Sequence, residues 1–188
     1  MIIIGITGTI GAGKGTVVKY LCEEKGYKHY SARGFIVEEI KRREMEVNRD
    51  SMMTVGNALR TEHDSAYVIT SLCDQAILSG GDAVIESIRT PGEVAAMRGK
   101  ANFYLLAVDA DIKVRYSRIT NRGLETDQVS FDEFVAQESR EMQSDDLNKQ
   151  NLSACIKQAD FMIQNDGSQE DLWRKIEGIL LSISLAKL

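Results

Sequence analysis

The chain contains 188 residues, of which 43% are hydrophobic and 27% charged, and its formal net charge is −5. This length favours a single domain over residues 1–188, and this composition excludes disordered, collagen-like and low-complexity chains. The negative charge argues against a polyanion-binding surface, and the 6% aromatic content argues against a platform for stacked bases. We therefore expect no nucleic-acid partner.

The cysteines and the apolar segments indicate a compartment. Cys22, Cys73 and Cys155 lie far apart, which is not the spacing of a disulfide framework or a zinc site and suits a reducing environment. The apolar run at residues 2–7 is too short for a signal peptide. No stretch approaches the ~20 apolar residues of a membrane span. We expect a cytoplasmic protein without a membrane partner.

Hydrophobic periodicity predicts strands that alternate with helices. A continuous β-branched run predicts a buried strand at 2–7, and apolar residues at i and i+4 predict a helix over 14–25. The other predicted strands are 27–31, 83–85, 102–109 and 161–163, and the other predicted helices are 33–46, 52–79, 91–99, 111–122, 130–142 and 168–186. This alternation is typical of an α/β fold with a parallel sheet.

The segment between the first strand and the first helix is rich in glycine. It reads Gly8-Thr9-Ile10-Gly11-Ala12-Gly13-Lys14-Gly15-Thr16. Glycine permits positive φ and a close approach of backbone N–H groups to an anion, and the following helix points its positive end at the same place. We predict that the phosphates of ATP bind to Gly8, Gly11, Ala12, Gly13, Lys14, Gly15 and Thr16. Lys14 would bridge the β- and γ-phosphates, and the Thr16 hydroxyl would help to hold Mg²⁺.

The end of this loop departs from the strict pattern Gly-x4-Gly-Lys-[Ser/Thr], because Gly15 follows the lysine. The ending Gly-Lys-Gly-Thr resembles adenylate kinase and its relatives, the nucleoside monophosphate kinase group. The resemblance implies a three-layer P-loop kinase fold with a five-stranded parallel sheet in the order 2-3-1-4-5. It also implies a helical acceptor-binding region at about 31–79 and a lid at about 122–150, which we expect to be the most mobile segment.

A second group of chemically active residues follows the predicted strand 83–85 and reads Glu86-Ser87-Ile88-Arg89. A carboxylate at the end of a parallel strand lies where α/β proteins bind ligands, so Glu86 is predicted to orient Mg²⁺ or polarise the acceptor. Arg89 is predicted to hold an acceptor phosphate through two hydrogen bonds. The adenylate kinase group carries Asp-Gly-x-Pro-Arg here, one residue more, which leaves the exact place of that phosphate open.

The run 84–94 resembles more closely the kinase-like P-loop domain fused to some deoxycytidylate deaminases, itself similar to dephospho-CoA kinase. Segments 56–60, 103–110 and 159–167 extend the resemblance over nearly the whole chain. It implies that Arg60 and Arg33 help to bind the acceptor, although Val37 stands near the place where that family often has an arginine.

The sequence lacks the deaminase signatures His-x-Glu and Pro-Cys-x-x-Cys. His29 and His63 are therefore expected to be polar surface or hydrogen-bonded residues and not zinc ligands.

Three arginines form a stripe on one predicted helix. Arg115, Arg118 and Arg122 stand at i, i+3 and i+7, roughly 90° from the apolar stripe at 100° per residue. A solvated face usually lies opposite the core, so this position favours the wall of a cleft. Lids of similar kinases use such arginines to neutralise the phosphoryl group in transfer. We predict that Arg118 and Arg122 are catalytic, together with Lys14 and Glu86.

The sequence therefore favours an ATP-dependent kinase that transfers the γ-phosphoryl group of Mg·ATP to a nucleoside or deoxynucleoside monophosphate. Two alternatives stay open. The first is a kinase of dephospho-CoA or another phosphorylated metabolite, and the second is a sensor that binds ATP or a dNTP without turnover. The altered acceptor loop and Val37 support the sensor. A monomer and a homodimer are both compatible with the sequence, which identifies neither the base nor the sugar of the acceptor.

Overall fold

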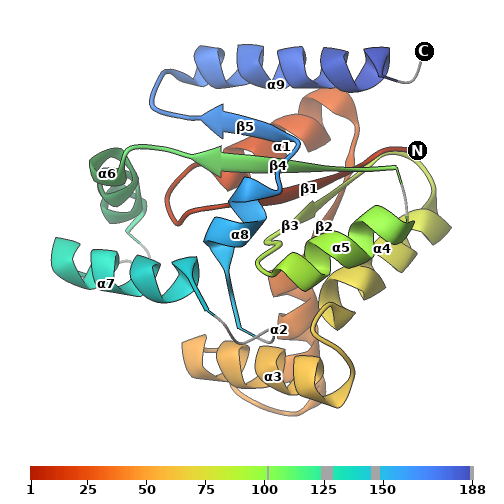
Figure 1. Cartoon of the computed structure of the whole chain (residues 1–188). Helices are drawn as coiled ribbons and strands as arrows, with labels where there is room; N and C mark the ends of the chain where they lie inside the picture. The colour runs from red at the N-terminus through yellow and green to blue at the C-terminus, as the bar shows by residue number, and fades with distance from the viewer. Residues whose placement is uncertain (101, 124–128, 145–148, 187–188) are drawn as a thin grey trace.

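Strands and helices alternate along the chain of the computed structural model (Figure 1). The structure describes residues 1–100, 102–123, 129–144 and 149–186. The strands are β1 Ile3–Gly8, β2 Lys28–Ser31, β3 Ala83–Glu86, β4 Phe103–Asp109 and β5 Phe161–Gln164. The helices are α1 Lys14–Lys25, α2 Ala32–Arg42, α3 Arg49–Glu62, α4 Tyr67–Ser79, α5 Pro91–Lys100, α6 Ile112–Arg122, α7 Phe131–Met142, α8 Leu152–Lys157 and α9 Gln169–Leu185.

The strands form one parallel sheet in the order β2-β3-β1-β4-β5. The predicted fold class and strand order are therefore confirmed. Ile6 of β1 pairs with Glu86 of β3, which pairs in turn with Ser31 of β2. Because the strands are parallel, their carboxyl ends lie along one edge of the sheet, where the loops that follow them meet.

Helices cover both faces of the sheet and make three layers (Figure 1). Ile3 of β1 belongs to the core packed by α4 and α5, whereas Ile4 and Ile6 belong to the core packed by α1 and α9. Every residue of β1 is buried, as a central parallel strand requires. Burial on both faces explains why this strand reads as a continuous apolar run in the sequence.

The helix expected over 52–79 is in fact two helices, and this prediction is wrong. The break lies between α3 and α4, where the Asp64 carboxylate accepts a hydrogen bond of 2.8 Å from the backbone N–H of Ala66. A short polar side chain that bonds to nearby backbone competes with the helix. Helix α2 also ends earlier than expected, at Arg42, and Glu44 beyond it has a φ of 56°. Helix α8 has no counterpart among the predicted elements.

Of the region expected at about 31–79 to bind the acceptor, α4 packs on β2 and β3 and belongs to the core of the sheet. Helices α2 and α3 lie below the sheet in Figure 1, and α7 lies beside α6. Of the region expected to form a lid, residues 124–128 and 145–148 lie outside the described residues. Between them, α7 is anchored by Phe134, which is buried and contacts the ring of Tyr116 on α6.

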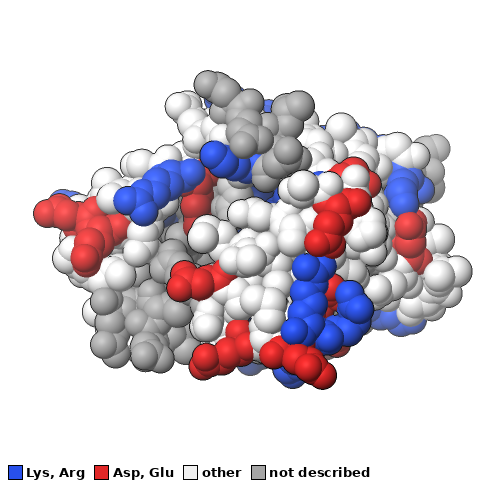
Figure 2. Space-filling model, turned by 90° about the horizontal axis from the view of Figure 1, so that it is seen from below, with Lys and Arg blue, Asp and Glu red and all other residues white. Residues whose placement is uncertain are grey.

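The surface carries mixed charge on the side of α2 and α3. Figure 2 shows Lys and Arg side chains next to Asp and Glu side chains over this face. Within the described residues, no helix combines the length and the apolar character that crossing a bilayer requires.

Candidate functional site

The glycine-rich loop between β1 and α1 has a backbone that requires glycine. Gly11 and Gly13 have φ values of 78° and 98°. A Cβ at Gly11 would lie 2.6 Å from the carbonyl oxygen of Arg115, and one at Gly13 would lie 2.4 Å from Nδ2 of Asn165. Because a side chain would be blocked at both positions, the loop requires glycine at each. The loop lies at the N-terminus of α1, where backbone N–H groups favour an anion.

Lys14, the first residue of α1, bends back onto this loop. Its Nζ donates hydrogen bonds to the carbonyl oxygens of Gly8 at 2.8 Å and Thr9 at 2.6 Å. Burial, and after it the positive charge of Arg89, lower the pKa of Lys14 from 10.5 to about 8. An anion at this place would stabilise the charged lysine, so the site has an electrostatic demand that phosphate groups can meet.

A cavity of about 660 Å³ lies against the loop. Its lining consists of Gly11, Gly13, Lys14, Gly15, Thr16, Glu86, Arg118, Ile119 and Arg122. The structure thus brings together most of the residues predicted to bind phosphate, hold a metal ion or neutralise charge. Its volume is in the range of small-molecule sites. The roles of these residues remain predictions.

Arg118 of the arginine stripe is held at the wall of the cavity. Its Nη2 donates to the carbonyl oxygen of Asn165 at 2.9 Å, and its Nη1 lies 3.5 Å from that of Ala12. The buried Asn165 side chain donates to the same Ala12 carbonyl at 2.8 Å. Asn165 therefore positions the loop, although no prediction included it. Its position directly after a predicted parallel strand could have indicated a site residue, because ligands bind at the carboxyl ends of such strands.

Arg115 lies outside the cavity and has a different role from its two neighbours on the stripe. It is 4% exposed, forms hydrogen bonds with both carboxylate oxygens of Glu138, and donates to the carbonyl oxygen of Ile10 at 3.3 Å. Asp109 at the end of β4 lies 3.4 Å from its Nε and accepts a bond of 2.5 Å from the Thr9 hydroxyl. These contacts join the glycine-rich loop to α6 and α7.

Glu86 faces the cavity and is held from the side of β2. Its Oε1 accepts a hydrogen bond from the Ser31 hydroxyl at 2.8 Å and lies 3.3 Å from Nε2 of His29. His29 is exposed, as expected, but this contact with a predicted site residue was not foreseen.

The residues present fit a Mg²⁺ ion that arrives with a nucleotide. Glu86 and Thr16 line the cavity and supply carboxylate and hydroxyl oxygens, which Mg²⁺ takes in addition to phosphate oxygens and water. Among the described residues there is no group of three or more His, Cys, Asp or Glu that could hold a metal ion without such help.

Arg89, the predicted ligand of the acceptor phosphate, is paired in this structure with side chains from the region expected to form a lid. Its Nη1 donates to Oε2 of Glu141 at 3.0 Å and to Oε1 of Gln150 at 2.7 Å. Both Arg89 and Glu141 act electrostatically on Lys14, so all three groups lie close together. The oxygens of Glu141 and Gln150 occupy positions at Arg89 that the oxygens of an anionic ligand would take.

Arg60 and Arg33, the other two arginines predicted to bind the acceptor, lie in different surroundings. Nη2 of Arg60 lies 3.9 Å from Oε1 of Glu93, and its buried Nε has no hydrogen-bond partner in the described parts of the chain. Glu93 is 2% exposed and burial raises its pKa, while its Oε2 accepts from the backbone N–H of Arg89 at 2.7 Å. Arg33 is exposed in the first turn of α2 and does not line the cavity.

A parallel sheet in this strand order, with a glycine-rich loop and a lysine between β1 and α1, defines a P-loop kinase-like fold. Residues 4–146 match the model of the AAA domain family AAA_18. The UPF0200 protein of Pyrobaculum aerophilum is 30% identical over 183 residues, which cover 96% of this chain and 98% of that protein. The chain therefore belongs to the AAA domain family and to the UPF0200 proteins. A UPF0200 protein of Methanothermobacter thermautotrophicus is 29% identical over 98% of this chain and 92% of its own.

Solved structures confirm the fold. The structure of TT1252 from Thermus thermophilus has a TM-score of 0.63 at 22% identity and covers 96% of this chain and 97% of its own. Shikimate kinase from Acinetobacter baumannii, in complex with shikimate, has a TM-score of 0.57 at 16% identity, with 96% and 93% covered. The expected P-loop kinase-like fold is thus confirmed, and the narrower resemblance to nucleoside monophosphate kinases stays a prediction.

Proposed function

We propose that this protein is an ATP-dependent kinase that transfers the γ-phosphoryl group of ATP to a small acceptor with a phosphate of its own, namely a nucleoside or deoxynucleoside monophosphate. The observation that supports this most is the concentration of positive charge at one place in an acidic chain. Lys14, Arg118 and Arg122 line one cavity, and Arg89 lies close enough to Lys14 to lower its pKa.

Phosphoryl transfer depends on positioning and charge neutralisation and needs no covalent nucleophile. The loop N–H groups and Lys14 would bind the β- and γ-phosphates. Arg118 and Arg122 would neutralise the charge on the phosphoryl group in transfer. Thr16 and Glu86 would hold Mg²⁺, which supplies further neutralisation of the phosphate oxygens when it is bound.

The acceptor would bind through Arg89 and Arg60. Arg89 already bonds to side-chain oxygens, and Arg60 has a buried Nε without a partner within the described residues. Guanidinium groups in such surroundings favour a phosphate, which accepts several charge-assisted hydrogen bonds. The same argument applies to dephospho-CoA or another phosphorylated metabolite, which stays the alternative acceptor. A nucleotide sensor without turnover also stays open, because Val37 replaces an arginine expected from the resemblance.

The test is ADP release from Mg·ATP with a panel of acceptors. The panel contains ribo- and deoxyribonucleoside monophosphates, dephospho-CoA and, because of the fold shared with shikimate kinase, shikimate. We expect release that depends on a nucleoside monophosphate. Release only with another compound would replace the proposed acceptor, and ATP binding without release with any of them would support the sensor.

A matched pair of variants on α1 tests the site itself. Lys14→Ala should abolish the release, whereas Lys19→Ala should not, because Lys19 is exposed on the same helix and forms a surface ion pair with Glu23. Circular dichroism should show the same fold for both variants. Unchanged turnover in Lys14→Ala would contradict the kinase assignment.

A further inference from the structure

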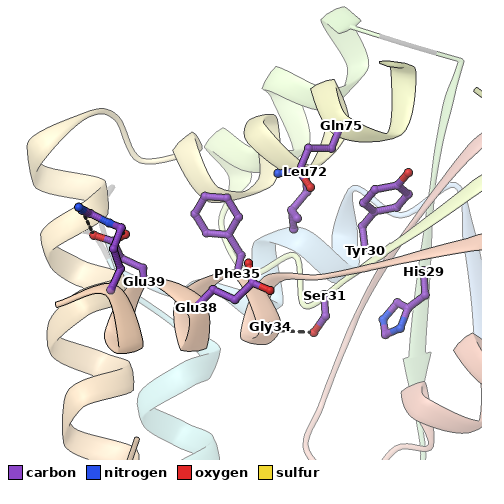
Figure 3. A pocket seen from close by; sticks show the side chains of 10 residues that line it. His29, Tyr30, Ser31, Gly34, Phe35, Glu38, Glu39, Leu72 and Gln75 are labelled. Atoms are coloured by element: carbon purple, nitrogen blue, oxygen red, sulfur yellow. Dashed lines mark hydrogen bonds and ion pairs between the residues drawn. The ribbon is translucent and has the colours of Figure 1, made fainter. Parts of the chain in front are cut away.

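A second cavity, of about 510 Å³, lies at the β2 edge of the sheet (Figure 3). It is formed by β2, α2 and α4, and its lining consists of His29, Tyr30, Ser31, Gly34, Phe35, Glu38, Glu39, Arg42, Leu72 and Gln75. In the described parts of the chain its lining shares no residue with that of the cavity at the glycine-rich loop. Its lining falls largely within the acceptor-binding region expected at about 31–79, but it includes none of the residues to which the proposed kinase reaction assigns a role.

The apolar part of this cavity is held in place by the core. Tyr30 and Phe35 are half-buried and pack against the core on the α4 side of the sheet. The Phe35 ring also meets the Tyr67 ring edge-on, with 6.2 Å between the centroids. In Figure 3 the rings of Phe35 and Tyr30 lie on either side of Leu72. Fixed aromatic and aliphatic groups of this kind suit a planar ring.

Gly34 provides a bare stretch of backbone in this cavity. A helix with glycine at an interior position is less stable than the same helix with alanine there. A Cβ at this position would lie 3.4 Å from Cβ of Ser31, which is an ordinary contact, so packing does not require glycine here. The missing side chain leaves room beside Phe35 and Ser31 that a ligand can fill.

The polar groups of the cavity select against an anion. Glu39 accepts hydrogen bonds from Arg42 and Arg43, which lower its pKa to about 2. The charge of these arginines is therefore already paired with that of Glu39. Glu38 and Gln75 form no hydrogen bond or ion pair with any of the described residues. A free carboxylate accepts hydrogen bonds and repels phosphate, whereas the Gln75 amide both donates and accepts.

We propose that this cavity binds an uncharged nucleoside. Its base packs against Phe35 and Tyr30, and its amino group donates a hydrogen bond to the carboxylate of Glu38. Gln75 bonds to a second group on the edge of the base. The cavity volume is sufficient for a molecule of this size.

This nucleoside site is separate from the cavity at the glycine-rich loop but adjacent to it. Ser31 and His29 line the nucleoside site, and both contact Glu86, which lines the other cavity. The proposal stands on the lining of the second cavity and does not depend on the proposed kinase activity.

Calorimetric titration of the full chain with adenosine, guanosine, cytidine and uridine tests the proposal. We expect at least one of the first three to bind, with uridine at least tenfold weaker because its base has no amino group. Glu38→Gln should remove most of this preference. Gln75→Ala should weaken binding by about tenfold, the loss of one good hydrogen bond in a partly apolar site. No binding of any of the four at millimolar concentration would overturn the proposal.

Two variants locate the bound nucleoside, one that fills the cavity and one that disables the glycine-rich loop. Gly34→Leu should abolish binding, whereas Gly178→Leu in α9, where a Cβ would meet nothing within 4 Å, should leave it unchanged. Lys14→Ala should also leave nucleoside binding unchanged. Binding that is lost in Lys14→Ala and kept in Gly34→Leu would place the nucleoside at the glycine-rich loop and overturn the proposal. Should Gly34→Leu fail to fold, the Glu38 and Gln75 variants decide.

Discussion

Arg115 of α6 and Glu138 of α7 form an ion pair through two hydrogen bonds, and the arginine side chain is almost completely buried. The same guanidinium donates to the carbonyl oxygen of Ile10 in the glycine-rich loop and lies over the ring of Phe134, 5.7 Å from its centroid. One side chain therefore joins the loop to the helix of the region expected to form a lid. Any movement of α7 away from α6 has to break this pair, and any movement of α6 away from the loop has to break the bond to Ile10.

The first prediction concerns the stability that depends on this pair. Glu138→Ala removes two charge-assisted hydrogen bonds from the buried Arg115, which keeps Asp109 at 3.4 Å, so the free energy of unfolding should fall by about 2 kcal/mol. Glu23→Ala is the control, because Glu23 pairs with Lys19 on the surface, with both side chains more than half exposed. Its effect should stay below about 1 kcal/mol. Urea denaturation measures both, and equal losses would show that burial of the Arg115 pair has no special weight.

The second prediction concerns pH. The pKa of Lys14 is lowered from 10.5 to about 8, so this lysine loses its proton in a range where an exposed lysine keeps it. Only the charged form attracts phosphate, so affinity for ATP should fall as the pH rises above about 8. Lys14→Arg stays charged throughout and should bind with an affinity that is flat from pH 7 to 9.5. Titration at constant Mg²⁺ tests this, and a flat profile for the wild-type chain would contradict it.

The third prediction separates binding from chemistry. If Arg122 neutralises the phosphoryl group mainly in the transition state, Arg122→Ala should lower kcat by at least roughly 100-fold and change ATP affinity by less than about fivefold. Arg174→Ala on α9 is the control, because that side chain is 78% exposed and pairs with Asp171 far along the chain from the cavity residues. Steady-state kinetics with nucleotide titration provides both numbers. A near-normal kcat in Arg122→Ala would remove this arginine from the reaction.

The fourth prediction concerns the acceptor. Arg89→Ala should raise the acceptor KM by at least about tenfold, because a charge-assisted contact made in both ground and transition state is lost. Glu141→Gln should have the opposite effect and lower the acceptor KM, because it weakens the ion pair that occupies Arg89. Asp132→Asn on the same helix is the control and should change little. A rise in KM with Glu141→Gln would mean that Glu141 itself belongs to the acceptor site.

Local patterns along the chain were enough to predict the α/β class, the position of the glycine-rich loop, and Glu86 and Arg89 after β3 as candidate site residues. These features depend on local physics. A strand buried on both faces has to be continuously apolar, and a phosphate loop needs glycine at specific neighbouring positions. The prediction of one helix over 52–79 was wrong at Asp64. Periodicity continues past this residue, but its side chain accepts a hydrogen bond from the backbone of Ala66 where the helix ends.

The different environments of the arginines in the stripe could not be predicted, because they depend on the packing of distant segments. Periodicity places Arg115 and Arg118 on one side of a helix, but it does not reveal that Glu138 and Ile10 surround the first while Asn165 and Ala12 hold the second. Those partners are distant in sequence and meet because parallel strands bring their carboxyl ends to one edge of the sheet. Contacts of this kind depend on how the elements pack and leave no periodic signal along the chain.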